Sequence, residues 1–137
     1  MVKWNQGIDG GCAFCKQQLE TRDHLFFRCT YSSSLWTRLM CQLMGTHYTE
    51  EWSNLILFMS QSPLSRTQMF LARYVFQTTL YMIWRERNAR KHGEKPRPQE
   101  TLFRVIDRQI KNRTSTIKTQ DKNLENAFQA WIVSVGT

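Results

Sequence analysis

The 137-residue sequence lacks the features of a membrane or secreted protein. None of its apolar runs approaches the ~18 residues that a membrane-spanning helix needs, so no span is expected. Residues 1–5 lead into polar sequence, with no apolar core and no small-residue cleavage site, so no signal peptide is expected. We therefore expect an intracellular protein, in nucleus or cytoplasm, whose cysteine thiols stay reduced.

Clustered carboxylates are also missing. The only aspartates are isolated in the sequence, and no Y-x-D-D stretch is present that would hold the two Mg²⁺ ions of polymerase chemistry: Asp9, Asp23, Asp107 and Asp121. Neither a G-x-S-x-G segment nor a glycine-rich phosphate loop occurs. The chain is therefore not expected to be an enzyme or to bind a small-molecule substrate.

The charge of the chain is unevenly distributed. Hydrophobic residues make up 41% and aromatic residues 12%, enough for one domain with a substantial core, and the net charge is +8. Residues 85–122 carry 12 Lys/Arg against 5 Asp/Glu, whereas residues 1–84 carry 7 against 5. This basic segment is what a nucleic-acid-binding surface requires, although a solvated helical face would explain the charge equally well.

Four residues near the N-terminus have the types and spacing of a metal site. They follow the pattern C-x2-C-x8-H-x4-C: Cys12, Cys15, His24 and Cys29. Three thiolates and one imidazole fill the tetrahedral coordination of Zn²⁺ and leave no position for a reactive water, so one structural zinc ion is predicted. Four separate core residues, or two disulfides, are the alternatives, and spacing together with compartment favours the metal.

The hydrophobic patterns predict a mainly α fold, in which a CCHC zinc knuckle (residues 1–31) precedes about five helices (residues 32–137) and packs with them as one domain. The helices are expected over residues 32–45, 50–60, 64–91, 99–119 and, last, through 124–132. Thr21 is expected to cap a short helix over residues 22–28. Cys29 should follow its end, because residues five apart lie about 140° apart around an α-helix. A hairpin around residues 12–15 is the one strand feature expected.

Several side chains receive specific predictions. Ser32, Ser33 or Ser34 is expected to cap the first long helix, and Asp121 the last. The inward faces of the second and fourth helices are predicted from their periodicity: Trp52, Leu55, Ile56 and Met59; then Leu102, Val105 or Ile106, Ile110, Arg113 and Ile117. Cys41 is expected in the core, His47 in a loop, and Gly93 at the end of the long helix.

The candidate nucleic-acid-binding residues lie in and just after the long helix: Arg85, Arg87, Arg90, Lys91, Lys95 and Arg97. Arginine can bind a phosphate through two hydrogen bonds at once. The neighbouring Trp84 is expected to be a core residue rather than a base-stacking one. His92 is expected to cap the helix or contact phosphate, and other cations could extend the surface: Lys16, Arg22, Arg28, Arg104, Arg108, Lys111 and Arg113.

Two separated motifs resemble one known family. The first contains Lys3-Trp4-Asn5, the two cysteines of C-x2-C, Glu20-Thr21-x-x-His24-Leu25-Phe26-Phe27-x-Cys29 and Trp36; the second is Tyr81-Met82-Ile83-Trp84-Arg85-Glu86-Arg87-Asn88. Together they resemble the zinc-binding domain that follows the reverse transcriptase in plant LINE-type non-LTR retrotransposons, in which the second motif reads Trp-x-Glu-Arg-Asn.

The resemblance implies a piece of a retroelement polyprotein, or a gene derived from one, that binds RNA or DNA without catalysis. The helical segment that usually precedes Trp4 in the family is missing here, so part of the packing surface is expected to be exposed or rearranged. The alternative is a helical module for protein–protein interaction or oligomerisation, with a structural zinc, since exposed apolar patches seek partners. In that case a homo-oligomer is expected.

Overall fold

The computed structural model describes residues 11–117 and 124–135. The described part is mainly helical, as predicted: η1 (His24–Arg28), α1 (Thr30–Met44), η2 (Gly45–His47), α2 (Trp52–Gln61), α3 (Arg66–Lys91), α4 (Gln99–Ile117) and α5 (Ala127–Val135). No strand occurs in residues 11–117 or 124–135, and the expected hairpin is reduced to one antiparallel bridge between Gly11 and Leu19. The expected lead-in Lys3-Trp4-Asn5 and the expected cap Asp121 lie outside the described residues.

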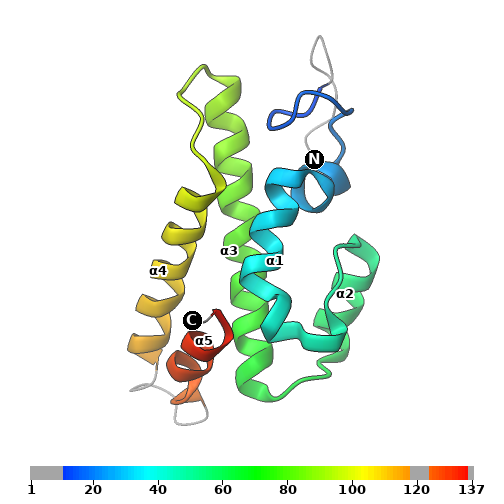
Figure 1. The fold of residues 1–137 in the computed structure, drawn as a ribbon. Coiled ribbons are helices and arrows are strands. Elements are labelled where there is room, and N and C mark those ends of the chain that lie inside the picture. The colour runs from blue at the N-terminus through cyan, green and yellow to red at the C-terminus, as the bar shows by residue number, and fades with distance from the viewer. Residues whose placement is uncertain (1–10, 118–123, 136–137) are drawn as a thin grey trace.

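The helices pack around α1 and α3. Figure 1 shows α1, α3 and α4 side by side, with α5 against the lower end of this group and α2 on the opposite side. Each pair among α1, α3, α4 and α5 is in contact, whereas α2 packs mainly against α3. The N-terminal metal loop, which we define as residues 11–20, lies beside the C-terminal end of α3 at the other end of the molecule (Figure 1). None of the described helices combines the length and apolarity needed to cross a bilayer.

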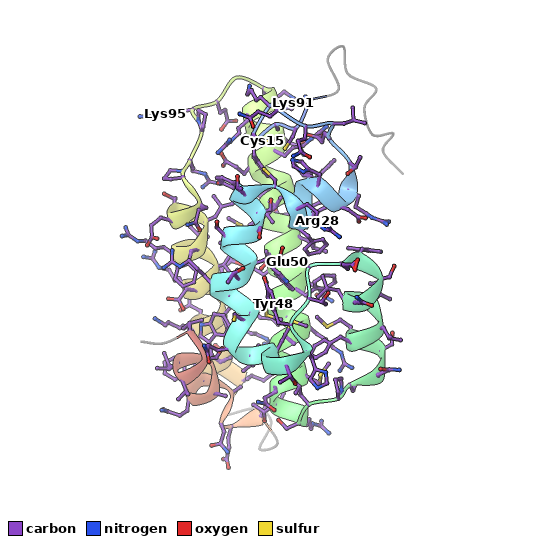
Figure 2. All side chains as sticks on the ribbon, turned by 45° about the vertical axis from the view of Figure 1, so that its right-hand side comes forward. Cys15, Arg28, Tyr48, Glu50, Lys91 and Lys95 are labelled. Atoms are coloured by element: carbon purple, nitrogen blue, oxygen red, sulfur yellow. The ribbon has the colours of Figure 1, made fainter. Side chains whose placement is uncertain are left out.

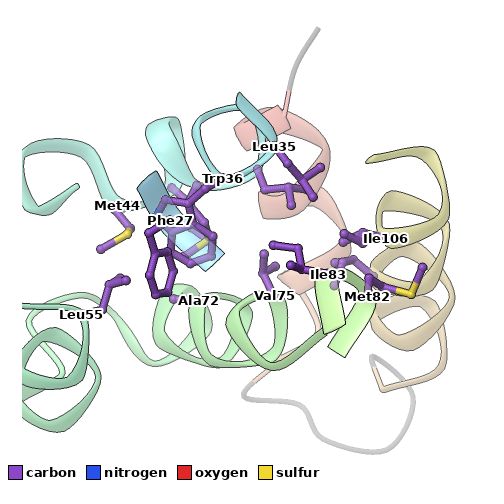
Figure 3. Close-up of a cluster of buried hydrophobic side chains, with 14 of the residues drawn as sticks. Phe27, Leu35, Trp36, Met44, Leu55, Ala72, Val75, Met82, Ile83 and Ile106 are labelled. Carbon is purple, nitrogen blue, oxygen red and sulfur yellow. The ribbon is translucent and has the colours of Figure 1, made fainter. Parts of the chain in front are cut away.

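One hydrophobic core connects the N-terminal segment to the helices. Phe27 of η1 is fully buried, with its ring 5.6 Å from that of Trp36 in α1 and 6.4 Å from that of Phe76 in α3. Figure 3 shows Phe27 and Trp36 over Ala72 of α3. Large buried aromatic side chains are strong contributors to stability, so these contacts hold η1 and α3 together.

The start of α1 differs from the prediction. The helix begins at Thr30 with Cys29 at its N-cap, and no side-chain cap is present, so the expected serine cap is wrong. The hydroxyl of Ser32 is buried and donates to the carbonyl of Leu25, while Ser33 Oγ lies 3.0 Å from both carboxylate oxygens of Glu50. These two serines therefore connect α1 to its neighbours instead of ending its first turn.

The periodicity predicted most of the inward faces. On α4, Leu102, Ile106, Ile110 and Ile117 are buried as predicted. Arg113 is exposed, and Thr114 is buried one position later, with its hydroxyl donating to the carbonyl of Ile110 at 2.8 Å. On α2, Leu55 is buried but Ile56 is 42% exposed, because this helix packs mainly against α3 and buries a narrow stripe that includes Phe58.

The ends of α3 follow their sequence signals. Ser65 and Gln68 form a capping box, in which the serine hydroxyl accepts from the Gln68 N–H and the glutamine side chain accepts from the Ser65 N–H. Gly93 lies just past the end of the helix with φ +85°, a conformation that glycine adopts at little cost. Both signals fix the length of α3, and the second turns the chain into the basic linker before α4.

Candidate metal centre

The four predicted ligands come together at the N-terminal end of the fold. Cys12 and Cys15 lie on the metal loop, His24 begins η1, and Cys29 lies between η1 and α1. Their ligand atoms all lie within 4.8 Å of one another, and Cys15 Sγ is 3.3 Å from His24 Nε2. Zn–S bonds of 2.3 Å place tetrahedral sulfurs about 3.8 Å apart, so a small contraction around an ion would complete the site. This is the one group of three or more potential metal ligands found in the described residues.

The metal loop is held in shape by its own backbone. Cys12 N–H donates to the carbonyl of Gln18 at 2.9 Å, and Lys16 N–H donates to the carbonyl of Cys12 at 2.9 Å. Lys16 has φ +61°, which closes this tight turn. The Phe14 N–H points at Cys12 Sγ at 3.4 Å, a contact that favours the thiolate form of the ligand.

A widened helical turn brings His24 and Cys29 together. Thr21 caps this turn as predicted, since its hydroxyl accepts from the His24 N–H at 3.1 Å. The Cys29 N–H then donates to the carbonyl of His24 at 2.7 Å, an i→i+5 bond of the π-helical type. In an α-helix, residues five apart point to different sides of the helix. The wider turn and the extended backbone of Cys29 instead bring His24 and Cys29 close enough to bind the same ion.

The electrostatics of the site suit a metal cation. All four cysteines of the sequence are free thiols rather than disulfides. A hydrogen bond from Cys29 lowers the pKa of Cys12 to about 5, while the same bond and burial raise the pKa of Cys29. A thiolate is the form that binds a metal ion, so the lowered pKa of Cys12 favours a divalent cation at this site. Zinc is the common ion for a closed set of three thiolates and one imidazole.

A buried glutamate fastens the metal loop to α3. Glu20 is 2% exposed, and its Oε1 accepts from the Ala13 N–H at 3.0 Å, between the first two cysteines. Its Oε2 accepts from Arg87 Nε at 3.0 Å and Nη2 at 2.8 Å. This two-bond ion pair spans 67 residues of sequence, so it fixes the position of the metal loop against the long helix.

A second buried glutamate fastens the linker after α3. Glu86 is 1% exposed and accepts from Arg90 Nε at 2.8 Å, from Arg97 Nε at 2.9 Å and from the Arg97 N–H at 2.9 Å. Burial raises the pKa of Glu86, but these three hydrogen bonds outweigh that effect and hold the pKa below its ordinary value. The carboxylate is therefore ionised at neutral pH and joins the linker to α3.

Arg90 connects this second network to the metal loop. Its guanidinium lies 4.9 Å from the ring centre of Phe14 and 4.8 Å from that of Tyr31, and these two rings stack at 4.5 Å. The Tyr31 hydroxyl and Arg90 Nη2 both donate to the carbonyl of Arg97. Burial, together with the charge of Glu86, raises the pKa of Tyr31 to about 12. The metal loop, α1, α3 and the linker thus meet at one arginine.

The six candidate nucleic-acid-binding residues therefore differ in their surroundings. Arg87, Arg90 and Arg97 form the ion pairs described above. Arg85, Lys91 and Lys95 are exposed, and no ion pair of theirs is found in the part of the chain that the structure describes. Figure 2 shows Lys91 and Lys95 at the same end of the molecule as Cys15.

The other basic residues near the metal site are partly engaged. Arg28 lies 3.5 Å from Glu51, and the Arg22 guanidinium lies 4.6 Å from the ring centre of Trp52. Lys16 is exposed, with no ion pair among the residues described. The predicted core position of Trp84 is only partly right, because its ring is partly exposed and lies 5.0 Å from the Arg87 guanidinium.

The remaining histidines and the fourth cysteine have no place in the metal site. His92 caps the C-terminus of α3, as expected, with Nδ1 2.8 Å from the Asn88 carbonyl. His47 is exposed at the end of the short turn η2. The predicted core position of Cys41 is wrong, because this residue is exposed: it lies one step, or about 100°, past the buried Met40.

Sequence reasoning missed the two glutamates as functional residues. Glu20 and Glu86 lie inside the two motifs that carry the family resemblance. The partner of Glu20 is 67 positions away, and one partner of Glu86 is 11 positions away. All of these partners are arginines that the sequence predicts to form a binding surface. The available sequence signals were an acid directly before Thr21 in the zinc-ligand motif and a single acid within a basic helical segment. Each is explained by an ion pair that only the folded chain reveals.

Comparison with known proteins supports the metal site. Residues 1–36 match the model of a family described as zinc-binding in reverse transcriptase, and this segment contains all four ligands and Glu20. No curated protein and no solved structure matches the chain significantly. The matched segment and the cluster of three cysteines and one histidine together fit a zinc-binding domain of the kind associated with reverse transcriptases.

Proposed function

We propose that this chain is a non-catalytic module that is stabilised by one zinc ion and binds nucleic acid through the cations around the metal centre. Cys12, Cys15, His24 and Cys29 would hold the ion. Because four protein ligands fill a tetrahedral coordination sphere, the ion would organise the fold and would not activate water. Zinc is the proposed ion because thiolate and imidazole ligands in this ratio suit it.

The observation that carries the nucleic-acid part of the proposal is a group of exposed cations at the metal-bearing end. Lys16, Arg85, Lys91 and Lys95 are exposed, with no ion pair found for them in residues 11–117 and 124–135. Glu94 is the exposed acid beside them and reduces their combined charge by one. In this proposal Arg87, Arg90 and Arg97 shape the surface through their glutamates, and the exposed cations contact phosphates.

An aromatic residue next to these cations supports single-stranded nucleic acid as a partner. Tyr81 is 58% exposed, and the Arg85 guanidinium lies 5.8 Å from its ring centre, one turn further along α3. Exposed aromatic rings beside arginine offer a stacking face to unpaired bases without selecting a sequence. The origin in a plant retrotransposon polyprotein is part of the same proposal and rests on the two motifs and the family match.

Salt dependence tests the proposed function. Labelled single-stranded RNA and duplex DNA are titrated with the zinc-loaded chain at two salt concentrations, beside sedimentation of the protein alone. If four cations neutralise about four phosphates, log affinity falls with log salt at a slope of about −3 for a single strand and about −3.6 for a duplex. The test variant replaces Arg85 and Lys95 with Ala. The matched control replaces Arg104 and Lys111 with Ala, since these two residues pair with acids on α4.

The test variant is expected to bind more weakly with a shallower slope, and the control variant to match the wild type. Absence of any nucleic-acid binding, together with a dimer that salt does not affect, would contradict the proposal and favour the protein–protein module.

A further inference from the structure

A small pocket lies between the metal loop and the C-terminal end of α3. Its lining is Gly11, Cys12, Ala13, Lys16, Arg90 and Lys91, and its volume is about 150 Å³. At ~30 Å³ per water molecule this space equals that of about five waters. It is therefore large enough for a phosphate group. Figure 2 shows Lys91 and Cys15 near each other at this end of the molecule.

The charges around the pocket favour an anion. Three of the six lining residues are cations, and none is a carboxylate. Lys16 and Lys91 are exposed, and neither has an ion pair within the described ranges. A neighbouring depression contains Arg85 and Lys95, but Glu86 and Glu94 also line it, so its net positive charge is smaller.

Arg90 is already held in place in this wall. Glu86 accepts from its Nε, the Arg97 carbonyl accepts from its Nη2, and its side chain is 13% exposed. No hydrogen bond from its Nη1 is found within the described residues, so that nitrogen keeps its donors for a ligand. A fixed guanidinium loses little conformational freedom on binding, which favours recognition of a phosphate oxygen.

Negative groups near the pocket reduce its positive charge without cancelling it. A zinc ion with three thiolates and one imidazole carries a formal charge of −1, and Cys12 contributes to the lining. The single charge of Glu86 is shared between Arg90 and Arg97. The carbonyls of Asn88, Ala89 and Arg90 accept backbone hydrogen bonds from the residues that follow α3, so these three carbonyls do not face an anion unpaired. The three cations therefore leave a net positive pocket.

We infer that this pocket is a phosphate-binding subsite that holds one phosphate of a nucleic acid against the metal loop. The inference rests on the proposed function and identifies one contact of the strand. The phosphate belongs either to the 5′ end or to the interior of the strand. Because Cys12 is both a candidate metal ligand and part of the lining, we expect the subsite to weaken when the metal is removed.

Two titrations test the subsite, and the first does not depend on nucleic-acid binding. Inorganic phosphate is added to the zinc-loaded chain at constant ionic strength, with chloride as the reference, while the amide resonances of Gly11, Ala13 and Lys16 are followed. Phosphate is expected to shift these resonances in the wild type and in the control Lys111→Gln. The shifts should be lost in the double variant Lys16→Gln/Lys91→Gln and should become smaller after chelation. Both replaced lysines are exposed, and retained zinc content and melting temperature confirm that the variant is folded.

The second titration identifies the source of the phosphate. Binding of a 5′-phosphorylated oligonucleotide is compared with that of the same oligonucleotide ending in a hydroxyl. A 5′-terminal phosphate predicts tighter binding of the phosphorylated strand by the wild type only. An internal phosphate predicts equal binding of both strands and, because one phosphate contact is lost, a salt slope that is smaller by about 0.7 in the double variant.

Phosphate that leaves the amides unmoved would overturn the inference, as would a double variant whose phosphate shifts match those of the wild type. If no oligonucleotide binds, the proposed function fails by itself. The phosphate titration still decides whether the pocket binds an anion.

Discussion

Replacement of Glu86 by glutamine tests how the basic segment is built. The glutamine keeps the shape of the side chain and one carbonyl oxygen but loses the charge that Arg90 and Arg97 share. Arg97 is 39% exposed and can turn toward water, whereas Arg90 is 13% exposed and cannot. Breaking a buried ion pair costs ~3–5 kcal/mol of folding free energy. The glutamine keeps one carbonyl oxygen as an acceptor, and Arg97 can turn toward water, so we expect a loss near the lower end, about 3 kcal/mol.

That loss is large compared with the 5–15 kcal/mol by which a domain of this kind is usually stable. For a chain of this size it corresponds to a melting temperature lower by about 10 °C. Thermal and urea unfolding, followed by circular dichroism at pH 7, measure the difference. Glu100→Gln is the matched control, because this half-exposed acid pairs with Arg38 and Arg104 at the surface, and its loss should leave the melting temperature nearly unchanged. Equal melting temperatures for Glu86→Gln and the wild type would refute the reasoning.

The same variant has a predicted pH dependence. The pKa of Glu86 is below the ordinary ~4.3 of a glutamate in the folded chain, so between the two values the unfolded chain binds the extra proton. The stabilisation is therefore complete above about pH 5 and is lost as the pH falls through the folded-state pKa. Wild type and Glu86→Gln should differ most near neutral pH and converge in acid. Metal loss in acid affects both proteins, so their difference isolates the carboxylate. A difference that grew as the pH fell would contradict this assignment.

Two further predictions concern the metal loop. Cys12→Ser and, in a separate variant, His24→Ala should each abolish cooperative unfolding of at least the N-terminal third. The reason is that structural zinc supplies ~10–16 kcal/mol of apparent binding free energy, which is comparable with the stability of a whole domain. An unchanged melting curve in either variant would show that the metal does not hold the fold. Glu20→Gln should weaken zinc affinity ~10–100-fold, because it removes the charge that fixes the metal loop to Arg87. Loss of a group that positions metal ligands commonly has an effect of this size. Competition with a chromophoric chelator measures this affinity, with Glu94→Gln as the exposed control, and equal affinities in the two variants would argue against a positioning role for Glu20.

The cluster of candidate metal ligands was the most predictable part of the molecule. Its four residues lie within 18 residues of one another, so residue type and spacing carry nearly all the information. Even the position of Cys29 just past a short helix followed from the angle between residues five apart. The π-helical turn that brings Cys29 back to His24 could not be read from the sequence, because it depends on Phe27 being held in the core.

Long-range charge pairing was the least predictable part. Helical periodicity placed the buried face of α4 correctly because that pattern is local. The basic segment looked uniform, yet three of its arginines pair with Glu20 or Glu86, and Arg87 reaches a residue 67 positions away. The sequence shows which side chains are charged but not which acid pairs with which arginine. Ile56 and Cys41 were misplaced because each lies one position beside a buried residue, and periodicity alone does not fix where a buried stripe ends.

The central claim is that one zinc ion, bound by three sulfurs and one ring nitrogen, organises the N-terminal end of this fold. Native mass spectrometry of the purified chain, before and after treatment with a strong chelator, tests it most directly. We expect one zinc ion for each chain, lost on chelation together with the cooperative unfolding transition and absent from Cys29→Ser. A folded chain without stoichiometric metal, or one in which Cys12 and Cys29 are joined by a disulfide, would contradict the account.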